Sequence, residues 1–287
     1  MWGAHYAQSV AAPVRTLHEV GEGVFAWLQP GGESGVSNAG VVVDDDGVTV
    51  IDTLMVPSQF EPFAEAVKGL GLPIRRIVLT HAHIDHVGGT KAFPHAGVYA
   101  TKATSAVLDQ PMMTDAYKAF MPAFAEEFDV LEEMGTRPAT HEVDGAAALT
   151  PRVELLPANG HTEGDLIVLV EEVDVCFPGD LCFFGVTPLA FQGDPAQWAN
   201  TLDAVADLAG TIVPGHGPIG NEDDVAELAT YLRHCVDANG DPAAIPPGPW
   251  DNWLERERDA INVERAAMLA SGTDEIPPAM LKALGLS

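Results

Sequence analysis

The chain contains the same order of segments twice: an apolar run that reaches an aspartate, a helical segment, and a second apolar run that reaches a histidine. The segments, in chain order, are VTVIDT (48–53), PSQFEPFAEAVKGL (57–70), RRIVLT (75–80), VDVCFPGD (173–180), PAQWANTLDAVADLAG (195–210) and TIVPGHG (211–217). Each copy would form strands and a helix that must bury an apolar face. The repeat therefore predicts two sheets packed face to face, with helices outside and both histidine-bearing strand ends at one edge.

Three histidines and an aspartate lie within six positions directly after the first repeat. In the stretch THAHIDHVGG, His81, His83 and Asp85 alternate, and His86 follows at once. Side chains two residues apart on a strand end share a face, and imidazole nitrogens with carboxylate oxygens are donors that zinc accepts. The pattern predicts a metal site rather than a group of solvated surface histidines. The glycine pair at 88–89 would let the backbone turn tightly behind it.

Further ligands are expected from distant turns. His161 lies in ANGHTEG before one apolar run, His216 lies in VPGHGP after another, and Asp180 lies in FPGDL. Their glycine neighbours allow the backbone to approach a metal closely. For the other histidines the sequence favours a role other than metal binding: His5, His18, His95, His141 and His234.

The motifs HAHIDH, GHTEGD, PGD and PGHG, in this order, resemble those of the metallo-β-lactamase superfamily, and the resemblance covers roughly residues 20–220. It implies an α/β fold, a four-layer αβ/βα sandwich of two mixed β-sheets with outer helices, and a binuclear metal centre at one edge. The implied ligands are His81, His83 and His161 for one ion, Asp85, His86 and His216 for the second, and Asp180 as the bridge between them. The chain is unlike the β-lactamases that have a cysteine in place of the second-metal histidine.

The resemblance also implies an enzyme, a binuclear metallo-hydrolase. A metal-bridging hydroxide would attack the carbonyl of an ester, lactone, thioester or cyclic amide, and Asp85 would orient the water and carry its proton. The cofactors would be two divalent metal ions, with zinc favoured over iron or manganese. The alternatives are a phosphodiesterase of the same fold and an iron-dependent oxidoreductase similar to persulfide dioxygenases.

Residues 1–287 are expected to form a single metallo-hydrolase domain, with a helical insert at about 105–138 and a C-terminal helical extension at about 222–287. The Met- and Phe-rich part of the insert, 109–138, is either an amphipathic helix packed on the core or a lid over the pocket. The glycine-rich loop 30–38 is either a mobile flap or a hairpin tip. Neither the repeat nor the motifs decide between these alternatives.

Charge and composition limit the partners. The chain has 14 Lys and Arg against 42 Asp and Glu, a formal net charge of −28, which disfavours nucleic acid and anionic membranes. The predicted partner is a small-molecule substrate of apolar or mixed character, with a homodimer left open. No apolar run approaches the length of about 18 residues that a membrane span needs. With no signal-like start and three cysteines, the sequence favours a cytoplasmic protein.

A few polar residues near the motifs have two interpretations each. Asp52 would hydrogen-bond a ligand histidine or cap a turn, and Thr162 would cap its turn or bond a ligand. Tyr117, in the insert, is a weaker candidate as a donor to a substrate oxygen. Cys176 and Cys182 are expected to be buried small apolar residues rather than ligands.

Overall fold

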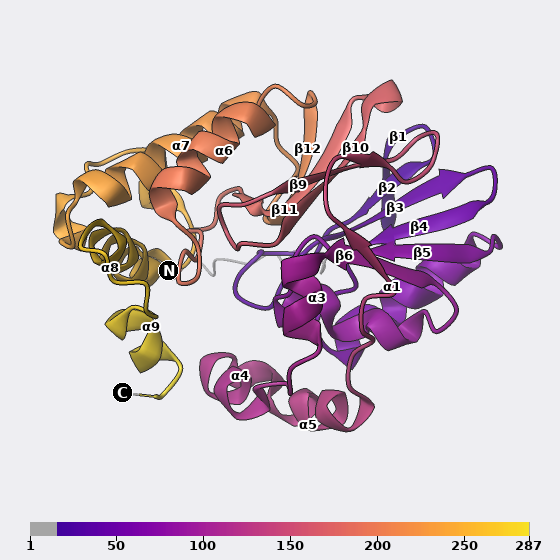
Figure 1. The fold of residues 1–287 in the computed structure, drawn as a ribbon, viewed down its shortest axis with the longest axis horizontal. Coiled ribbons are helices and arrows are strands. Elements are labelled where there is room, and N and C mark those ends of the chain that lie inside the picture. The colour runs from indigo at the N-terminus through magenta and orange to yellow at the C-terminus, as the bar shows by residue number, and fades with distance from the viewer. Residues whose placement is uncertain (1–15, 287) are drawn as a thin grey trace, which may run out of the picture.

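Two β-sheets lie face to face between helices in the computed structural model, which describes residues 16–286 (Figure 1). The first sheet has the order β1-β2-β3-β4-β5-β6-β7. Its strands are β1 (Leu17–Gly21), β2 (Val24–Trp27), β3 (Ala39–Asp44), β4 (Gly47–Ile51), β5 (Ile74–Val78), β6 (Gly97–Thr101) and β7 (His141–Val143). It is a mixed sheet, because β1 to β4 pair antiparallel and β4 to β7 pair parallel.

The second sheet has the order β12-β11-β10-β9-β8 and is also mixed. Its strands are β8 (Ala147–Ala148), β9 (Glu154–Ala158), β10 (Asp165–Val170), β11 (Val175–Phe183) and β12 (Thr211–His216). Only β11 and β12 pair parallel; the other pairs are antiparallel. The two mixed sheets with outer helices confirm the predicted four-layer sandwich.

The predicted repeat corresponds to two β-α-β units, one in each sheet. In the first, α1 (Pro57–Gly69) connects β4 to its parallel neighbour β5; in the second, α6 (Pro195–Val205) connects β11 to its parallel neighbour β12. A parallel pair requires such a crossover, and the crossover helix covers the outer face of its sheet. Both second strands therefore carry their histidines to the same edge of the sandwich.

Three apolar layers separate the four layers of structure. Between the sheets, Val42, Ile51 and Val78 of the first sheet pack with Val168 and Phe177 of the second. The neighbouring residues in the same strands point outward, toward α1 in the first sheet and α6 in the second. Because successive strand side chains alternate between faces, strands buried on both sides must read as continuous apolar runs. This is why short apolar runs in the sequence indicate these strands.

The insert between β6 and β7 contains three helices, α3 (Lys102–Leu108), α4 (Thr114–Phe120) and α5 (Ala125–Met134), rather than one long amphipathic helix. Pro122 separates α4 from α5, because proline disfavours a helical residue before it and cannot donate a backbone hydrogen bond. Phe128 and Leu131 are fully buried against the first sheet and α1, as expected for packing on the core. Met113, in the same Met- and Phe-rich part, is 59% exposed.

Three helices follow β12: α7 (Glu222–Asp237), α8 (Asp259–Ala270) and α9 (Pro278–Ala283). α7 packs against α6 and β11 on the outside of the second sheet. α8 and α9 lie below α6 and α7 at the left of the view in Figure 1. That residues 1–287 form a single domain stays a prediction, and α8 supports it because it packs on both α6 and α7.

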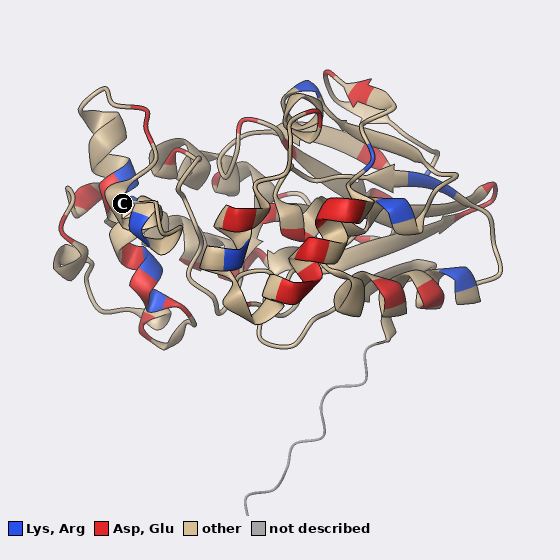
Figure 2. Cartoon of the chain, turned by 90° about the horizontal axis from the view of Figure 1, so that it is seen from below, with Lys and Arg blue, Asp and Glu red and all other residues tan. Residues whose placement is uncertain are grey.

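Acidic side chains outnumber basic ones on the helices that face the viewer in Figure 2. This agrees with the net charge of −28. Within residues 16–286, no helix is both long and apolar enough to cross a membrane.

The close approach of the two sheets depends on Gly40 in β3. A Cβ on Gly40 would lie 2.5 Å from the ring of Phe177 in β11. We expect Gly40→Ala to destabilise the fold by about 1–3 kcal/mol through overpacking, measured as the free energy of unfolding in urea. Gly69→Ala is the control, since its Cβ would meet nothing within 4 Å. Equal stability of the two variants would contradict this account of the sheet contact.

Candidate metal centre

All seven predicted ligand residues converge at one edge of the sandwich. His81, His83, Asp85 and His86 follow β5, the last two in the short helix α2 (Ile84–Val87). His161 lies in the turn between β9 and β10, Asp180 within β11, and His216 at the end of β12. They form two groups, each able to hold a metal ion: His81, His83, His161 and Asp180 in one, and Asp85, His86 and His216 in the other.

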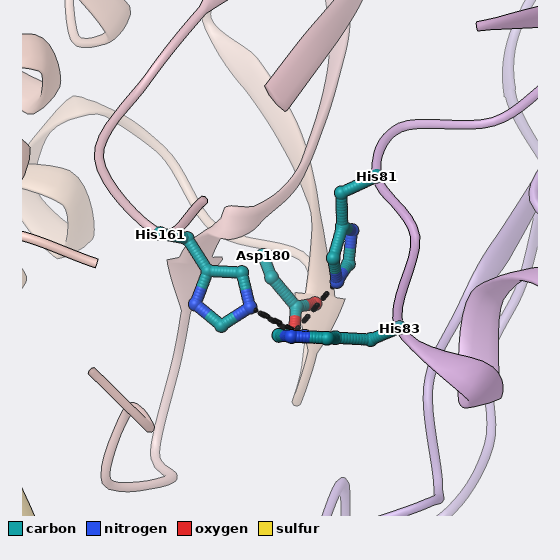
Figure 3. Close-up of side chains that lie close together, drawn as sticks. All are labelled: His81, His83, His161 and Asp180. Carbon is teal, nitrogen blue, oxygen red and sulfur yellow. Dashed lines mark hydrogen bonds and ion pairs between the residues drawn. The ribbon is translucent and has the colours of Figure 1, made fainter. Parts of the chain in front are cut away.

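The first group joins the two halves of the chain (Figure 3). His161 Nε2 lies 2.9 Å from His83 Nδ1 and 3.4 Å from Asp180 Oδ2. His81 Nε2 lies 3.6 Å from the same carboxylate oxygen. One ligand atom from each of the four residues lies within 4.8 Å of all the others. Three imidazole nitrogens and a carboxylate oxygen at such separations can surround one small cation.

The second group lies on the other side of Asp180. His216 Nε2 is 3.2 Å from Asp85 Oδ2, and His86 Nε2 is 4.0 Å from it. Asp180 also approaches this group, with Oδ1 at 3.0 Å from His86 Nε2 and Oδ2 at 3.5 Å from His216 Nε2. Its carboxylate therefore lies between the two groups.

The cluster is largely buried, and the net pKa shifts of its histidines run in opposite directions although burial lowers the pKa of each. Burial is the main reason that the pKa of His161 falls to about 3 and that of His81 falls well below its usual value. Burial also opposes the charged form of His216, but the Asp180 and Asp85 carboxylates outweigh it and raise that pKa to about 9. The charge of His86, together with the hydrogen bond and charge of His216, overcomes the burial of Asp85 and lowers its pKa to about 2. Ionised carboxylates in a buried pocket favour bound cations.

The outward-facing ring nitrogens of four histidines have oxygen partners. The pairs are His81 Nδ1 with Thr80 Oγ1 at 3.1 Å, His83 Nε2 with Gln192 Oε1 at 2.8 Å, His86 Nδ1 with Asp52 Oδ2 at 2.8 Å, and His216 Nδ1 with the Gly32 carbonyl at 2.9 Å. An acceptor at one ring nitrogen holds the proton there and leaves a lone pair on the other nitrogen. In each case that other nitrogen faces the cluster.

Two of the inward-facing nitrogens show whether a metal ion would fit the cluster. Nε2 of His81 is buried and makes no hydrogen bond among the described residues, and buried Nε2 of His86 makes none either, although Asp180 Oδ1 lies 3.0 Å away. A buried polar atom without a partner costs free energy unless something else binds it. The donor set and these two atoms fit divalent metal ions.

Asp52 connects β4 to the cluster, as the hydrogen-bonding interpretation proposed. Its carboxylate accepts hydrogen bonds from His86 Nδ1 and from the backbone and hydroxyl of Thr80. Thr162 acts within its own turn, where its hydroxyl donates to Asp165 Oδ1 at 2.6 Å. Asp165 also accepts from the backbone N–H of His161, which fixes the turn that presents this histidine.

The glycine pair after His86 has a different role from the predicted one. Gly88 and Gly89 are not in the left-handed region, so no unusual turn requires them. A Cβ on Gly88 would lie 1.9 Å from the Met55 carbonyl oxygen, and one on Gly89 would lie 2.2 Å from that of Thr53. The pair allows a close approach of two backbones rather than a tight turn.

Loop 30–38 is anchored at the site, and only its start is exposed. Besides the Gly32 carbonyl, Ser37 Oγ donates to the backbone oxygen of Asp85 at 2.5 Å. Asn38 Nδ2 donates to the carbonyls of Pro214 and Gly217 on either side of His216. The loop joins the antiparallel strands β2 and β3, so it is a hairpin connection as one alternative had it. These contacts hold it against the cluster and do not support a mobile flap.

The remaining candidates lie outside the two groups. His18, His95, His141 and His234 belong to neither, and His5 lies outside the described residues. Cys176 and Cys182 are fully buried, and burial raises the pKa of both thiols, as expected for apolar packing. Tyr117 is partly buried, with its ring stacked on Phe128 at 5.7 Å. Sequence reasoning missed Gln192 and Ser37, whose local sequence carries no recognisable motif.

Residues 32–216 match the sequence profile of the metallo-beta-lactamase superfamily. The chain belongs to this superfamily. The matched region contains all seven residues of the two groups and ends at His216. Superfamily membership therefore agrees with the geometry, which places the same residues together without reference to any relative.

Known proteins similar to this chain include one from Bacillus subtilis (strain 168) that is named Uncharacterized protein YobT. It is 29% identical over 149 residues, which are 50% of this chain and 60% of that protein. A hydroxyacylglutathione hydrolase from Crocosphaera subtropica is 30% identical over 161 residues, 53% of each chain. The chain thus spans little more than half the length of these relatives. Among solved structures, the metallo-beta-lactamase FIM-1 from Pseudomonas aeruginosa, in a mono-zinc form, has a TM-score of 0.57 and 24% identity, covering 80% of this chain and 96% of that one. This last likeness concerns the fold.

The Asp52–His86 hydrogen bond predicts a role for Asp52 in metal binding. We expect Asp52→Ala to weaken binding of one metal ion by about 10- to 100-fold, because His86 loses the acceptor that fixes its ring. The measurement is a competition titration with a chromophoric chelator. Asp45→Ala is the control, since Asp45 is exposed on the neighbouring turn. Unchanged affinity in Asp52→Ala would show that Asp52 only stabilises the turn.

Proposed function

We propose that this protein is a binuclear metallo-hydrolase that cleaves a carbonyl substrate. One observation carries the proposal: the Asp180 carboxylate lies within 3.6 Å of imidazole nitrogens from both groups. A single carboxylate shared in this way suits two cations held close together. The first ion would be held by His81, His83 and His161, the second by Asp85, His86 and His216, and Asp180 would contact both.

Two bound divalent ions would supply a Lewis acid and a water molecule whose pKa falls from about 15.7 toward roughly 7. Zinc fits the nitrogen-rich donor set best, with iron or manganese as alternatives. The protein contributes the fixed orientation of the rings, through the acceptors on their outer nitrogens. It also keeps the carboxylates ionised, as the low pKa of Asp85 indicates.

Asp85 is the residue that we propose to handle the proton. Its side chain is 12% exposed, against 4% for Asp180, so it is the more accessible of the two carboxylates. Oδ2 faces His216 Nε2 at 3.2 Å, which leaves Oδ1 to accept a hydrogen bond from an incoming water. Its backbone oxygen is held by Ser37, so the carboxylate is presented from a fixed position. Proton transfer at such a group contributes typically 10²–10⁴-fold to rate.

The surroundings favour an apolar or mixed substrate. In the insert, Met112, Tyr117 and Phe120 pack as partly buried side chains on the core of the first sheet, and the chain as a whole is strongly acidic. Tyr117 lies close enough to Asp85 that this charge adds to the burial that raises the pKa of its phenol. A polyanionic phosphodiester would be repelled by this charge. The hydroxyacylglutathione hydrolases among the relatives point to thioesters as one member of the substrate class, together with esters, lactones and cyclic amides.

The proposal predicts the metal content and the substrate class. The purified protein should contain two divalent ions per chain by elemental analysis. It should hydrolyse at least one of a chromogenic ester, a lactone, a thioester or nitrocefin, and a chelator should abolish that activity. Turnover of bis-p-nitrophenyl phosphate alone would overturn carbonyl hydrolysis in favour of a phosphodiesterase. One iron per chain would overturn the binuclear hydrolase in favour of an oxidoreductase.

Asp85→Asn separates proton handling from metal binding. The amide keeps the shape of the side chain and one donor oxygen but cannot take up a proton. We expect kcat to fall about 10²- to 10⁴-fold while most of the metal is retained. Asp207→Asn, at an exposed position after α6, is the control and should change neither quantity. A normal rate in Asp85→Asn would remove Asp85 from the mechanism.

A further inference from the structure

Three buried polar residues lie on one side of α8 and just before it. Arg258, Asn262 and Arg265 are spaced four and three residues apart, which places them on one face of a helix. They are 4%, 0% and 5% exposed. Two guanidinium groups and an amide buried on one face require partners, because burial without hydrogen bonds is costly.

Each of the three forms hydrogen bonds with backbone atoms of one segment, residues 187–193, which lies between β11 and α6. The hydrogen bonds are Arg258 NH1 to the Thr187 oxygen at 2.8 Å, Asn262 Nδ2 to the Pro188 oxygen at 2.9 Å, the Ala190 N–H to Asn262 Oδ1 at 2.9 Å, Arg265 Nε to the Gly193 oxygen at 2.8 Å, and Arg265 NH2 to the Gln192 oxygen at 3.2 Å. A segment with no regular structure of its own is thus held along its length by one helix face.

The same segment carries the groups that hold His83. Gln192 Oε1 lies 2.8 Å from His83 Nε2, and the Phe191 ring stacks on the His83 ring with centroids 5.3 Å apart. The segment also supports the turn of His161, because the Asp194 N–H donates to the Gly160 carbonyl at 3.1 Å. A Cβ on Gly193 would lie 2.2 Å from that carbonyl oxygen, so the two backbones are in direct contact.

We propose that α8 positions the first ligand group, with Arg265 acting on His83 through Gln192. This inference rests on the proposed function, since it concerns the metal that His83 would hold. The helix lies outside residues 32–216, the region that matches the superfamily profile. The C-terminal extension is therefore part of the metal centre of this chain, and Arg265 is a positioning residue rather than a ligand.

Arginine suits this position because its guanidinium presents several donors in a fixed plane. In Arg265, Nε and NH2 reach two successive carbonyls, and NH1 donates to the Glu275 oxygen at 3.0 Å. Its charge is paired with Asp274, which is 76% exposed, at 2.7 Å. A lysine could reach only one of these carbonyls at a time and would hold the segment less firmly.

The test is a spectroscopic titration of the full chain with Co²⁺, in which the affinity is determined separately for the first and the second equivalent of Co²⁺. Arg265→Met and Gln192→Leu should each weaken the affinity for one equivalent by about 10- to 100-fold and change the visible absorption of that ion. Arg265→Lys should lie between the wild type and Arg265→Met. Arg233→Met is the matched control, because Arg233 forms an exposed ion pair with Asp203 on the neighbouring helices, and it should bind Co²⁺ normally.

The double variant Arg265→Met/Gln192→Leu shows whether Arg265 affects metal binding through Gln192. If Arg265 acts through Gln192, the double variant loses no more affinity than the weaker-binding single variant. Additive losses, or an equal loss for both ions, would overturn the proposal. If Arg265→Met does not fold, the same comparison is made with Arg265→Lys. Unchanged affinity in these variants overturns this inference alone, whereas a wild-type chain that binds no Co²⁺ overturns the proposed function as well.

Discussion

The buried Asp180 carboxylate, surrounded by imidazoles from both halves of the chain, is the contact on which the site depends. It lies at 3.0 to 3.6 Å from four histidine nitrogens. The charges of His86 and His216 contribute most to overcoming its burial, and they keep its pKa well below the usual value. An ionised group in such a place needs positive charge around it. The imidazoles supply part of that charge as long as His86 and His216 are protonated. Bound cations would supply it permanently and release those protons, which is the physical reason that we interpret the cluster as a metal centre.

The sandwich fold brings these side chains together. Each β-α-β unit ends a parallel strand at the same edge, and the apolar layer between the sheets fixes the distance between the two ends. Gly40 and Phe177 show how close that packing is. The candidate ligand atoms of each group lie within 4.8 Å of one another although they come from residues 81 to 216, and the close packing of the sheets behind them holds the strand ends in place.

Irregular segments surround the metal-binding cluster and hold its residues in place. Loop 30–38 holds His216 and Asp85, Asp52 holds His86, and residues 187–193 hold His83. Irregular backbone can be this rigid only when its own polar groups have partners. Here those partners come from α8, in the C-terminal extension, and from the turns beside His216. The site is thus distributed over more of the chain than its motifs suggest.

Local patterns in the sequence indicated the two β-α-β units, two packed sheets and seven candidate ligands: apolar runs, the alternation of His81, His83 and Asp85, and glycines beside His161 and His216. The mixed strand order and the division of the seven residues between two ions were implied by the resemblance to the superfamily. Tertiary structure alone decided that loop 30–38 is anchored, that the glycine pair after His86 serves a close approach, and that Gln192 and Arg265 support His83. These contacts join residues between 33 and 184 positions apart, most of them through backbone carbonyls that every residue possesses. No local pattern can mark them, because the partner is chosen by the packing and not by the side chain.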